Sequence, residues 1–137
     1  MTGIVVLGHG RFAGGLVDAA QMIAGRQKGI AAVELSPQDT PESFKDKVEA
    51  AIAGVASGED GILLLCDLLG GTPMNVAAFL AERHGYQCVA GANLPLILEV
   101  LMNRVGNSAR DLAAIAVNAG HAGVVDVRLR LTEQQVE

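Results

Sequence analysis

The sequence predicts an α/β fold in which a mostly parallel sheet lies between two layers of helices. Apolar runs of strand length alternate along the chain with helix-like segments. One of these runs, Ile62-Leu63-Leu64-Leu65, is apolar without alternation, which is typical of a strand buried on both faces. Strands joined by helices pair in parallel through right-handed crossovers. We therefore expect a three-layer sandwich with its strands, numbered along the chain, in the order 2-1-3-4.

The individual elements follow from local patterns. Strands are expected at residues 3–8, 30–35, 61–67 and 86–90. The first helix has one apolar face, formed by Phe12, Leu16, Ala19, Ala20 and Ile23. The second begins after Thr40 as its cap, with Pro41 in the first turn, and carries an apolar stripe of Phe44, Val48, Ile52 and Val55. Three more are expected over 73–83, over 94–105 and from a capping box of Ser108 and Asp111 to residue 119.

The last segment, residues 124–131, has a different pattern. Apolar residues alternate strictly with charged ones, and the apolar set is Val125, Val127, Leu129 and Leu131. Such one-sided alternation predicts an antiparallel strand at the edge of the sheet. An unpaired apolar edge invites association, so we expect a homodimer held partly by this strand. The expected domain is residues 1–131, followed by a short polar tail, 132–137.

Composition narrows the class of protein. A chain of 137 residues fits one domain, and a net charge of −5 with scattered positive residues argues against nucleic-acid binding. No apolar run approaches the roughly 20 residues of a membrane span. Met1 leads directly into a strand, so we expect no signal peptide and a cytoplasmic protein. Cys66 and Cys88 lie in apolar segments and are interpreted as small buried residues. No Cys/His spacing predicts a metal, and no cofactor is expected.

His9 and Asp67 are the candidate catalytic residues. His9 lies between Gly8 and Gly10 directly after the first strand, and Asp67 ends the third. Ligands in parallel α/β folds bind outside the carboxyl ends of strands. If these two strands are neighbours, the two side chains meet at that edge.

The chemistry that this pair favours is phosphorylation of the imidazole. A carboxylate that accepts the proton of one ring nitrogen leaves the other free as a nucleophile and stabilises positive charge on the ring. A phosphoryl group bound there would face Gly70, Gly71 and Thr72 and the start of the following helix, with Gly10 close by. The pattern therefore predicts a metal-free phosphohistidine site.

A dinucleotide-binding module is the alternative from the residues alone. Gly8-x-Gly10-x-x-Ala13 follows a strand and opens a helix, and Glu34 lies near the end of the next strand, where an acid meets a ribose. The motif is short, however, and a His fills one of its variable positions. The remaining histidines, His84 and His121, are interpreted as a solvated helix end and a turn residue.

The chain resembles the IIA component of the mannose-type (mannose–fructose–sorbose) bacterial phosphotransferase system. The resemblance covers essentially the whole chain and rests on residues 3–10 with His9, on Asp67-Leu68-Leu69-Gly70-Gly71-Thr72-Pro73-Met74-Asn75 and on Gly91-Ala92-Asn93-Leu94-Pro95. It implies that His9 accepts phosphate from the phosphocarrier protein HPr and passes it to a IIB component. It also implies that Asp67 orients the ring, that Thr72 and nearby amides hold the phosphoryl group, and that a cytoplasmic homodimer exchanges a C-terminal strand.

One departure from the best-known family arrangement leaves the biological role open. The sequence ends at Glu137 without an Ala/Pro-rich linker or a fused IIB domain. We therefore expect the acceptor to be a separate protein. A purely regulatory interaction protein, whose phosphorylation state is read by a partner, is a further alternative to a role in sugar uptake.

Overall fold

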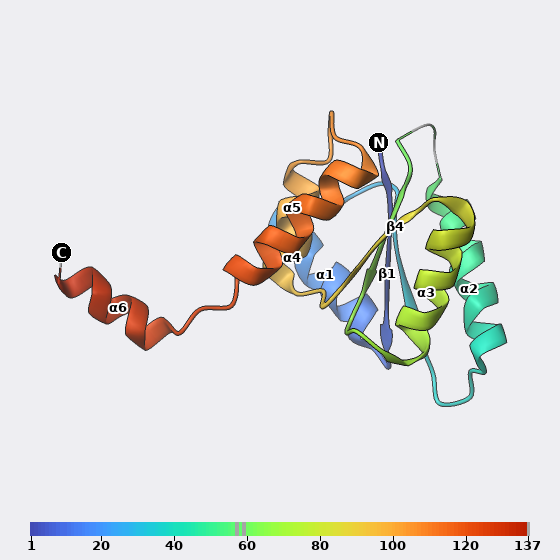
Figure 1. The fold of residues 1–137 in the computed structure, drawn as a ribbon, viewed down its shortest axis with the longest axis horizontal. Coiled ribbons are helices and arrows are strands. Elements are labelled where there is room, and N and C mark those ends of the chain that lie inside the picture. Colours follow the sequence, from blue (N-terminus) through green and yellow to red (C-terminus); the bar gives the residue numbers. More distant parts are fainter. Residues whose placement is uncertain (57, 59, 137) are drawn as a thin grey trace.

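The computed structural model describes residues 1–56, 58 and 60–136, and they form a parallel sheet flanked by helices (Figure 1). The strands are β1 (Gly3–His9), β2 (Ile30–Leu35), β3 (Ile62–Cys66) and β4 (Gln87–Ala90). They lie in the order β2-β1-β3-β4, and all three pairings are parallel. The predicted parallel sheet and its strand order are confirmed.

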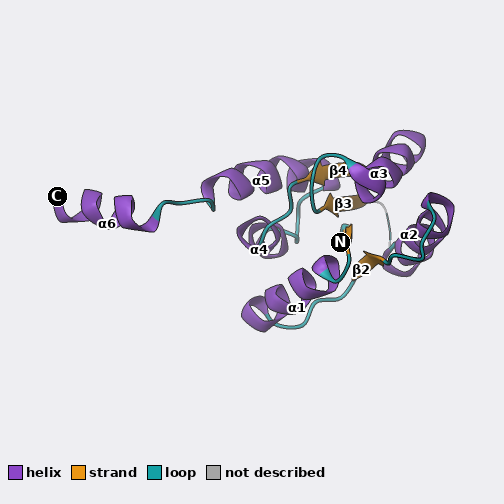
Figure 2. Ribbon diagram, turned by 90° about the horizontal axis from the view of Figure 1, so that it is seen from below, coloured by secondary structure: helices purple, strands orange, loops and turns teal. Residues whose placement is uncertain are grey.

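Helices cover both faces of this sheet (Figure 2). One face carries α1 (Phe12–Ala24), α4 (Leu94–Met102) and α5 (Ala109–Ala122), and the other carries α2 (Pro41–Val55) and α3 (Gly71–His84). Successive residues of β1 therefore enter different cores: Ile4 and Val6 face the first layer, and Val5 and Leu7 face the second. All four are fully buried, and full burial of such a side chain contributes about 1.5–3 kcal/mol. The central strand is thus anchored from both sides.

The starts of α2 and α5 agree with the sequence predictions, but the buried face of α1 differs from the predicted one. Thr40 caps α2 as expected and forms a capping box with Ser43, and the expected capping box of Ser108 and Asp111 also forms. In α1, however, the buried stripe is Ala13, Leu16, Val17 and Ala20, while two residues expected inside are 39% (Phe12) and 62% (Ile23) exposed. The inner stripe has the ideal i, i+3, i+4, i+7 spacing. Its small Ala13 and Ala20 permit close packing on the sheet, so the helix is rotated relative to the expected face.

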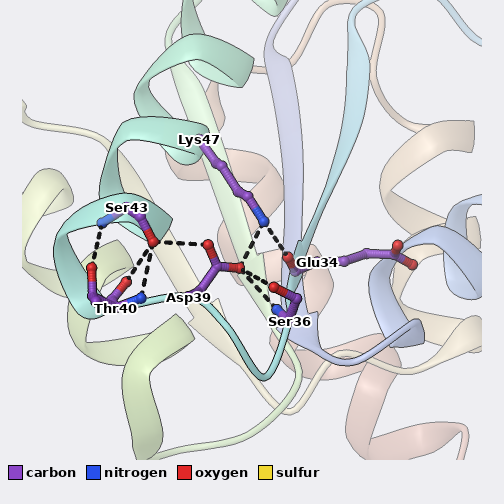
Figure 3. Close-up of polar contacts among 6 residues, drawn as sticks. All are labelled: Glu34, Ser36, Asp39, Thr40, Ser43 and Lys47. Atoms are coloured by element: carbon purple, nitrogen blue, oxygen red, sulfur yellow. Dashed lines mark hydrogen bonds and ion pairs between the residues drawn. The ribbon is translucent and has the colours of Figure 1, made fainter.

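The turn between β2 and α2 is fixed by one carboxylate (Figure 3). Asp39 accepts hydrogen bonds from Lys47 Nζ at 2.6 Å, from Ser43 Oγ at 2.8 Å and from the amide and hydroxyl of Ser36 at 2.9 and 3.0 Å. Lys47 also donates to the carbonyl of Glu34. The hydrogen bond from Lys47, followed by those from Ser36 and Ser43, holds the pKa of Asp39 well below its usual range. The carboxyl edge of β2 therefore ends in a rigid turn beside β1.

A buried arginine closes the opposite edge of the sheet. Arg104 is 2% exposed and donates hydrogen bonds to the carbonyl oxygens of Thr2, Lys28 and Gly29. Burial lowers the pKa of its guanidinium. Carbonyl oxygens at the starts of β1 and β2 are thereby satisfied away from water, and the sequence pattern contained no signal for this contact.

The C-terminal segment corrects a prediction. Of residues 124–131, which were expected to form an antiparallel edge strand, 127–131 lie instead in helix α6 (Val127–Val136) and 124–126 form the loop before it. The helix extends away from the domain (Figure 1). The apolar residues expected on the buried strand face are exposed, at 67% for Val127, 57% for Leu129 and 54% for Leu131. A lone strand leaves its backbone groups unpaired, whereas a helix pairs them internally. Leu, Arg, Glu and Gln are also good helix formers.

Helix α6 runs across the expected boundary between residues 131 and 132, and residue 137 of the expected polar tail lies outside the described residues. Within the described part of the chain, no single helix has the length and apolar character needed to cross a membrane. One pair of consecutive described segments, Ala109–Ala122 with Val127–Gln134, has this length and apolar character when the two are taken together, but the pair is bent by 79°.

Candidate functional site

The adjacency of β1 and β3 brings His9 and Asp67 together at the carboxyl edge of the sheet. In the register of the two strands Leu7 is paired with Cys66, and the amide of Asp67 continues the ladder by donating to the Leu7 carbonyl at 3.0 Å. The imidazole Nδ1 of His9 then lies 2.7 Å from Oδ2 of Asp67. The two candidate catalytic residues, which are 58 positions apart in the sequence, therefore form a hydrogen-bonded pair.

The hydrogen bonds of Asp67 set the orientation of the ring. Oδ2 accepts from both the backbone amide (2.9 Å) and Nδ1 (2.7 Å) of His9, and Oδ1 accepts from the amide of Leu68 at 3.0 Å. A carboxylate cannot donate, so Nδ1 carries the proton and Nε2 of the neutral ring keeps its lone pair. The side chain of Asp67 is 9% exposed, but that of His9 is 49% exposed. The free nitrogen thus belongs to a ring that a second protein can reach.

Two opposing effects act on the pKa of Asp67. Burial raises the pKa of the carboxyl. The hydrogen bonds from the amide and ring of His9, the positive charge of a protonated ring and the hydrogen bond from the Leu68 amide lower this pKa, and together they outweigh the effect of burial. The net result is a pKa below the usual value. The carboxylate therefore stays ionised and available to stabilise a positively charged imidazole.

The first residue of α3 lies against the exposed side of the ring. A methyl group added at Gly71 would lie 3.1 Å from Cε1 and 3.2 Å from Nε2 of His9, and Gly71 has φ +82°. The cap residue of α3, Gly70, makes no side-chain hydrogen bond to the helix start. The leading N–H groups of a helix lack intrahelical partners and attract anions. An anion bound to Nε2 would therefore meet backbone donors at this helix end.

The other expected phosphoryl-binding residues differ in what they offer. Thr72 is half-buried in the first turn of α3, at the helix end that faces the ring. Gly10 has φ +56°, which favours glycine, and its amide donates to the carbonyl of Leu35 at 2.9 Å. The amide of Gly10 is thus part of the ladder with β2, whereas Gly70, Gly71 and Thr72 form the start of the helix.

The first glycine of the dinucleotide-like motif, Gly8, has a packing role in this fold. A methyl group at Gly8 would lie 3.0 Å from Cδ1 of Phe12 and 3.4 Å from Cβ of Asp67. The carboxylate of Glu34 lies over α1, where a methyl group at Gly14 would be 2.7 Å from Oε2. Gly8 is therefore explained by the close approach of Phe12 and Asp67, without a nucleotide.

Sequence reasoning missed three exposed apolar residues in the segments that follow β1 and β3. Leu68 and Leu69, in the loop between Asp67 and Gly70, are 48% and 82% exposed, and Phe12, the first residue of α1, is 39% exposed. The available signal was a pair of leucines inside a loop rather than in a strand or helix. Among the described residues, no group of three His, Cys, Asp or Glu side chains is arranged to hold a metal ion.

Comparison with known proteins identifies the family and the fold of this chain. The sequence matches the family described as "PTS system fructose IIA component" (EIIA-man) over residues 3–117. It is 34% identical over 113 residues to the "PTS system fructose-specific EIIA component" of Bacillus subtilis (strain 168), covering 82% of this chain and 77% of that one. The structure of a phosphotransferase system component EIIA from Streptococcus agalactiae superposes with a TM-score of 0.85 at 26% identity, covering 94% of this chain and 99% of that one.

A longer relative matches as well. The "PTS system mannose-specific EIIAB component" of Escherichia coli (strain K12) is 32% identical over 137 residues, 98% of this chain, and the chain spans 42% of that relative's length. Fold and site together define an α/β protein that presents a carboxylate-oriented histidine beside a helix N-terminus. The chain belongs to the mannose-type family of IIA components of the sugar phosphotransferase system.

The ionisation of Asp67 gives a direct test of this pair. The carboxyl of Asp67 is expected to titrate below the usual value of about 3.9, and His9→Ala is expected to raise its midpoint, because one hydrogen bond and a nearby charge are lost. Carbon-13 NMR of the labelled carboxyl measures both midpoints. Because the folded-state pKa is lowered, the carboxylate adds stability above the unfolded-state pKa, and this stability disappears as the pH falls through the folded-state value. An unchanged midpoint in His9→Ala would contradict the interaction.

Proposed function

We propose that the protein is a phosphoryl-transfer relay of the sugar phosphotransferase system, in which His9 accepts phosphate from phosphorylated HPr and passes it to a IIB component. The observation that carries the proposal is the 2.7 Å hydrogen bond between Nδ1 of His9 and Oδ2 of Asp67. This hydrogen bond leaves Nε2 free beside the start of α3. The relatives named above are IIA and IIAB components, which supports the same reaction. The proposed place of action is the cytoplasm, and no cofactor is invoked.

The proposed step moves one phosphoryl group between two nucleophiles. The lone pair of Nε2 attacks the phosphorus, the bond from phosphorus to the donor breaks, and the donor keeps that electron pair. The ring of His9 becomes positive, and Asp67 stabilises this charge while holding the proton on Nδ1. The oxygen atoms of the phosphoryl group accept hydrogen bonds from the N–H groups of Gly71 and Thr72 and from the Thr72 hydroxyl. Attack on the phosphorus by an acceptor reverses these steps and regenerates neutral His9.

The surroundings of His9 favour a protein donor over a small molecule. The side chain of His9 is 49% exposed. Leu68 and Leu69 directly follow Asp67, Phe12 begins the helix after β1, and these three exposed apolar residues form the proposed rim. Apolar side chains gathered around a reactive group are typical of a surface that a partner covers. We propose that HPr and the IIB component use this same rim in turn, because both must reach Nε2.

The phosphorylation test uses the whole chain. With HPr, its upstream kinase and phosphoenolpyruvate, the protein is expected to gain the mass of one phosphoryl group, in an adduct that is stable to base and labile to acid. His9→Ala is expected to fold and to gain none. His84→Ala and His121→Ala are matched controls, since both residues are exposed and lie outside the site, and both are expected to behave as the wild type. Full labelling of His9→Ala would refute the assignment.

The helix start that receives the phosphoryl group is tested by three variants. Thr72→Ser keeps the hydroxyl and is expected to transfer at close to the wild-type rate, whereas Thr72→Val is expected to be roughly tenfold slower or more, since a lost hydrogen bond to a charged group costs about 1.5–3 kcal/mol. Gly71→Val is expected to be the slowest, because its Cβ meets Nε2 of His9 and φ is +82°. Rapid-quench measurement of phosphoryl uptake checks the order. Equal rates for Thr72→Val and Thr72→Ser would remove the hydroxyl from the mechanism.

We further propose a homodimer in which residues 124–131 of one protomer pair with the sheet edge of its partner. Within the part of the chain that the structure describes, β4 pairs with β3 alone, and such an edge offers unpaired backbone groups. A groove of about 420 Å³ borders β4 and has apolar walls that include Val89, Leu96 and Val117. The alternating apolar residues of segment 124–131 are exposed in the single chain. Pairing of this segment with a second copy would bury them in a closed two-fold assembly.

Truncation after Gly123 tests the dimer. The full chain is expected to sediment as a dimer at micromolar concentration and the truncated chain as a folded monomer, because the removed residues make the exchange contacts. The unfolding midpoint of the full chain is expected to rise with protein concentration, and that of the truncated chain is expected to stay constant. Circular dichroism provides the control for folding. A stable dimer after truncation would refute the exchange.

A further inference from the structure

Two cysteines lie in contact directly behind the site. Sγ of Cys66, at the end of β3, is 3.8 Å from Sγ of Cys88 in β4, and both are free thiols. In the strand register Cys66 is paired with Ala90, and Cys88 with Leu64. The two cysteines are therefore diagonal neighbours on the face of the sheet that packs against α2 and α3.

The two thiols differ in exposure and in the direction in which their pKa values are shifted. Cys66 is fully buried and Cys88 is partly exposed. The hydrogen bond between the two sulfurs lowers the pKa of the Cys88 thiol, and the same bond together with burial raises the pKa of Cys66. A partly exposed thiol that ionises more readily, beside a buried second thiol, is the arrangement of an attacking and a resolving cysteine.

We propose that Cys66 and Cys88 form a reversible intramolecular disulfide with low-molecular-weight disulfides as the oxidant, and that this bond slows phosphoryl transfer at His9. The first half of the proposal stands on the contact between the two sulfurs. The second half rests on the function proposed above.

The exchange is balanced in two steps. The Cys88 thiolate attacks one sulfur of the small disulfide, forms a mixed disulfide and releases one small thiolate. Cys66 then attacks Sγ of Cys88, gives its proton to solvent or to the leaving group, and releases the second small thiol. The protein loses two hydrogen atoms, and one small disulfide is reduced to two thiols. A small dithiol reverses both steps.

The geometry also indicates why the bond would be labile. A disulfide needs sulfurs about 2.05 Å apart, so the present 3.8 Å must shorten. β4 is a four-residue edge strand, whereas β3 is fully buried between two neighbours. We therefore expect β4, rather than β3, to move when the two sulfurs approach each other. Strained disulfides have more oxidising potentials and are the ones that are readily reduced.

The coupling to His9 runs through one peptide unit. Cys66 precedes Asp67. The carbonyl oxygen of Cys66 accepts hydrogen bonds from the amides of Gly91 (3.0 Å) and Ala92 (2.9 Å), which follow β4. A displacement of β4 relative to β3 thus acts on Cys66 at both its side chain and its carbonyl. Asp67 positions the ring of His9 through a 2.7 Å hydrogen bond, and misplacement of a reacting group by about 1 Å can cost about 100-fold in rate.

The chemical half is tested with oxidised glutathione and the full chain under non-reducing conditions. The wild type is expected to lose two hydrogen atoms in intact mass and to resist alkylation at both cysteines, and dithiothreitol is expected to restore both thiols. Cys66→Ser is expected to stop at a glutathione adduct on Cys88, because the resolving thiol is missing. Cys88→Ser is expected to stay unmodified, since Cys66 is buried. A wild type that keeps both thiols, retains the adduct or forms a link between chains would overturn the disulfide.

The functional half compares phosphoryl uptake from HPr after the oxidant has been removed. The oxidised wild type is expected to be slower by roughly tenfold or more and to recover with dithiothreitol, while Cys88→Ser is expected to keep one rate throughout. An oxidised protein that transfers at the reduced rate would overturn the coupling. If the reduced protein takes up no phosphate, the proposed relay function fails, and the mass measurement still decides the disulfide.

Discussion

The site depends on one hydrogen bond, between Nδ1 of His9 and Oδ2 of Asp67, and this bond depends on the pairing of β1 with β3. Neither residue has a local reason to face the other, because 58 positions separate them. The two strands bring them together because both are buried on both faces. A shift of one residue in register would turn alternate apolar side chains toward the wrong layer. The core thus determines the geometry of the site.

The anion-binding part of the site consists of backbone rather than of charged side chains. Gly71 brings the start of α3 within contact distance of Nε2, and the cap residue Gly70 leaves the first amides of the helix without a side-chain partner. Backbone donors are fixed in place before the phosphoryl group arrives, so binding costs little reorganisation. A relay also has to release what it binds. Neutral donors at a helix end hold an anion less strongly than a bidentate arginine does, and this suits transfer in both directions.

The sequence predicted the features that arise from local pattern. Unbroken apolar runs implied a parallel sheet, and its strand ends implied where His9 and Asp67 lie. The helix of residues 127–136 could not be predicted in this way, because alternation describes a strand only when the segment pairs with a sheet edge. In the single chain this segment extends away from the sheet and pairs its own backbone groups as a helix. The burial of Arg104 and the contact between Cys66 and Cys88 were missed for another reason. Both depend on distances between elements that periodicity does not contain.

Both the proposed dimer and the proposed disulfide act on β4, so the two equilibria must be linked. Pairing of residues 124–131 of a partner with the open edge of β4 would hold that strand in register, whereas the disulfide requires β4 to be displaced relative to β3. A binding event that favours one position of a strand disfavours the other, and the effect is reciprocal. Dimer formation would therefore oppose closure of the bond between Cys66 and Cys88, and oxidation would weaken the dimer. On this reasoning, the edge strand farthest from β2 connects assembly of the protein to the carboxylate that orients His9.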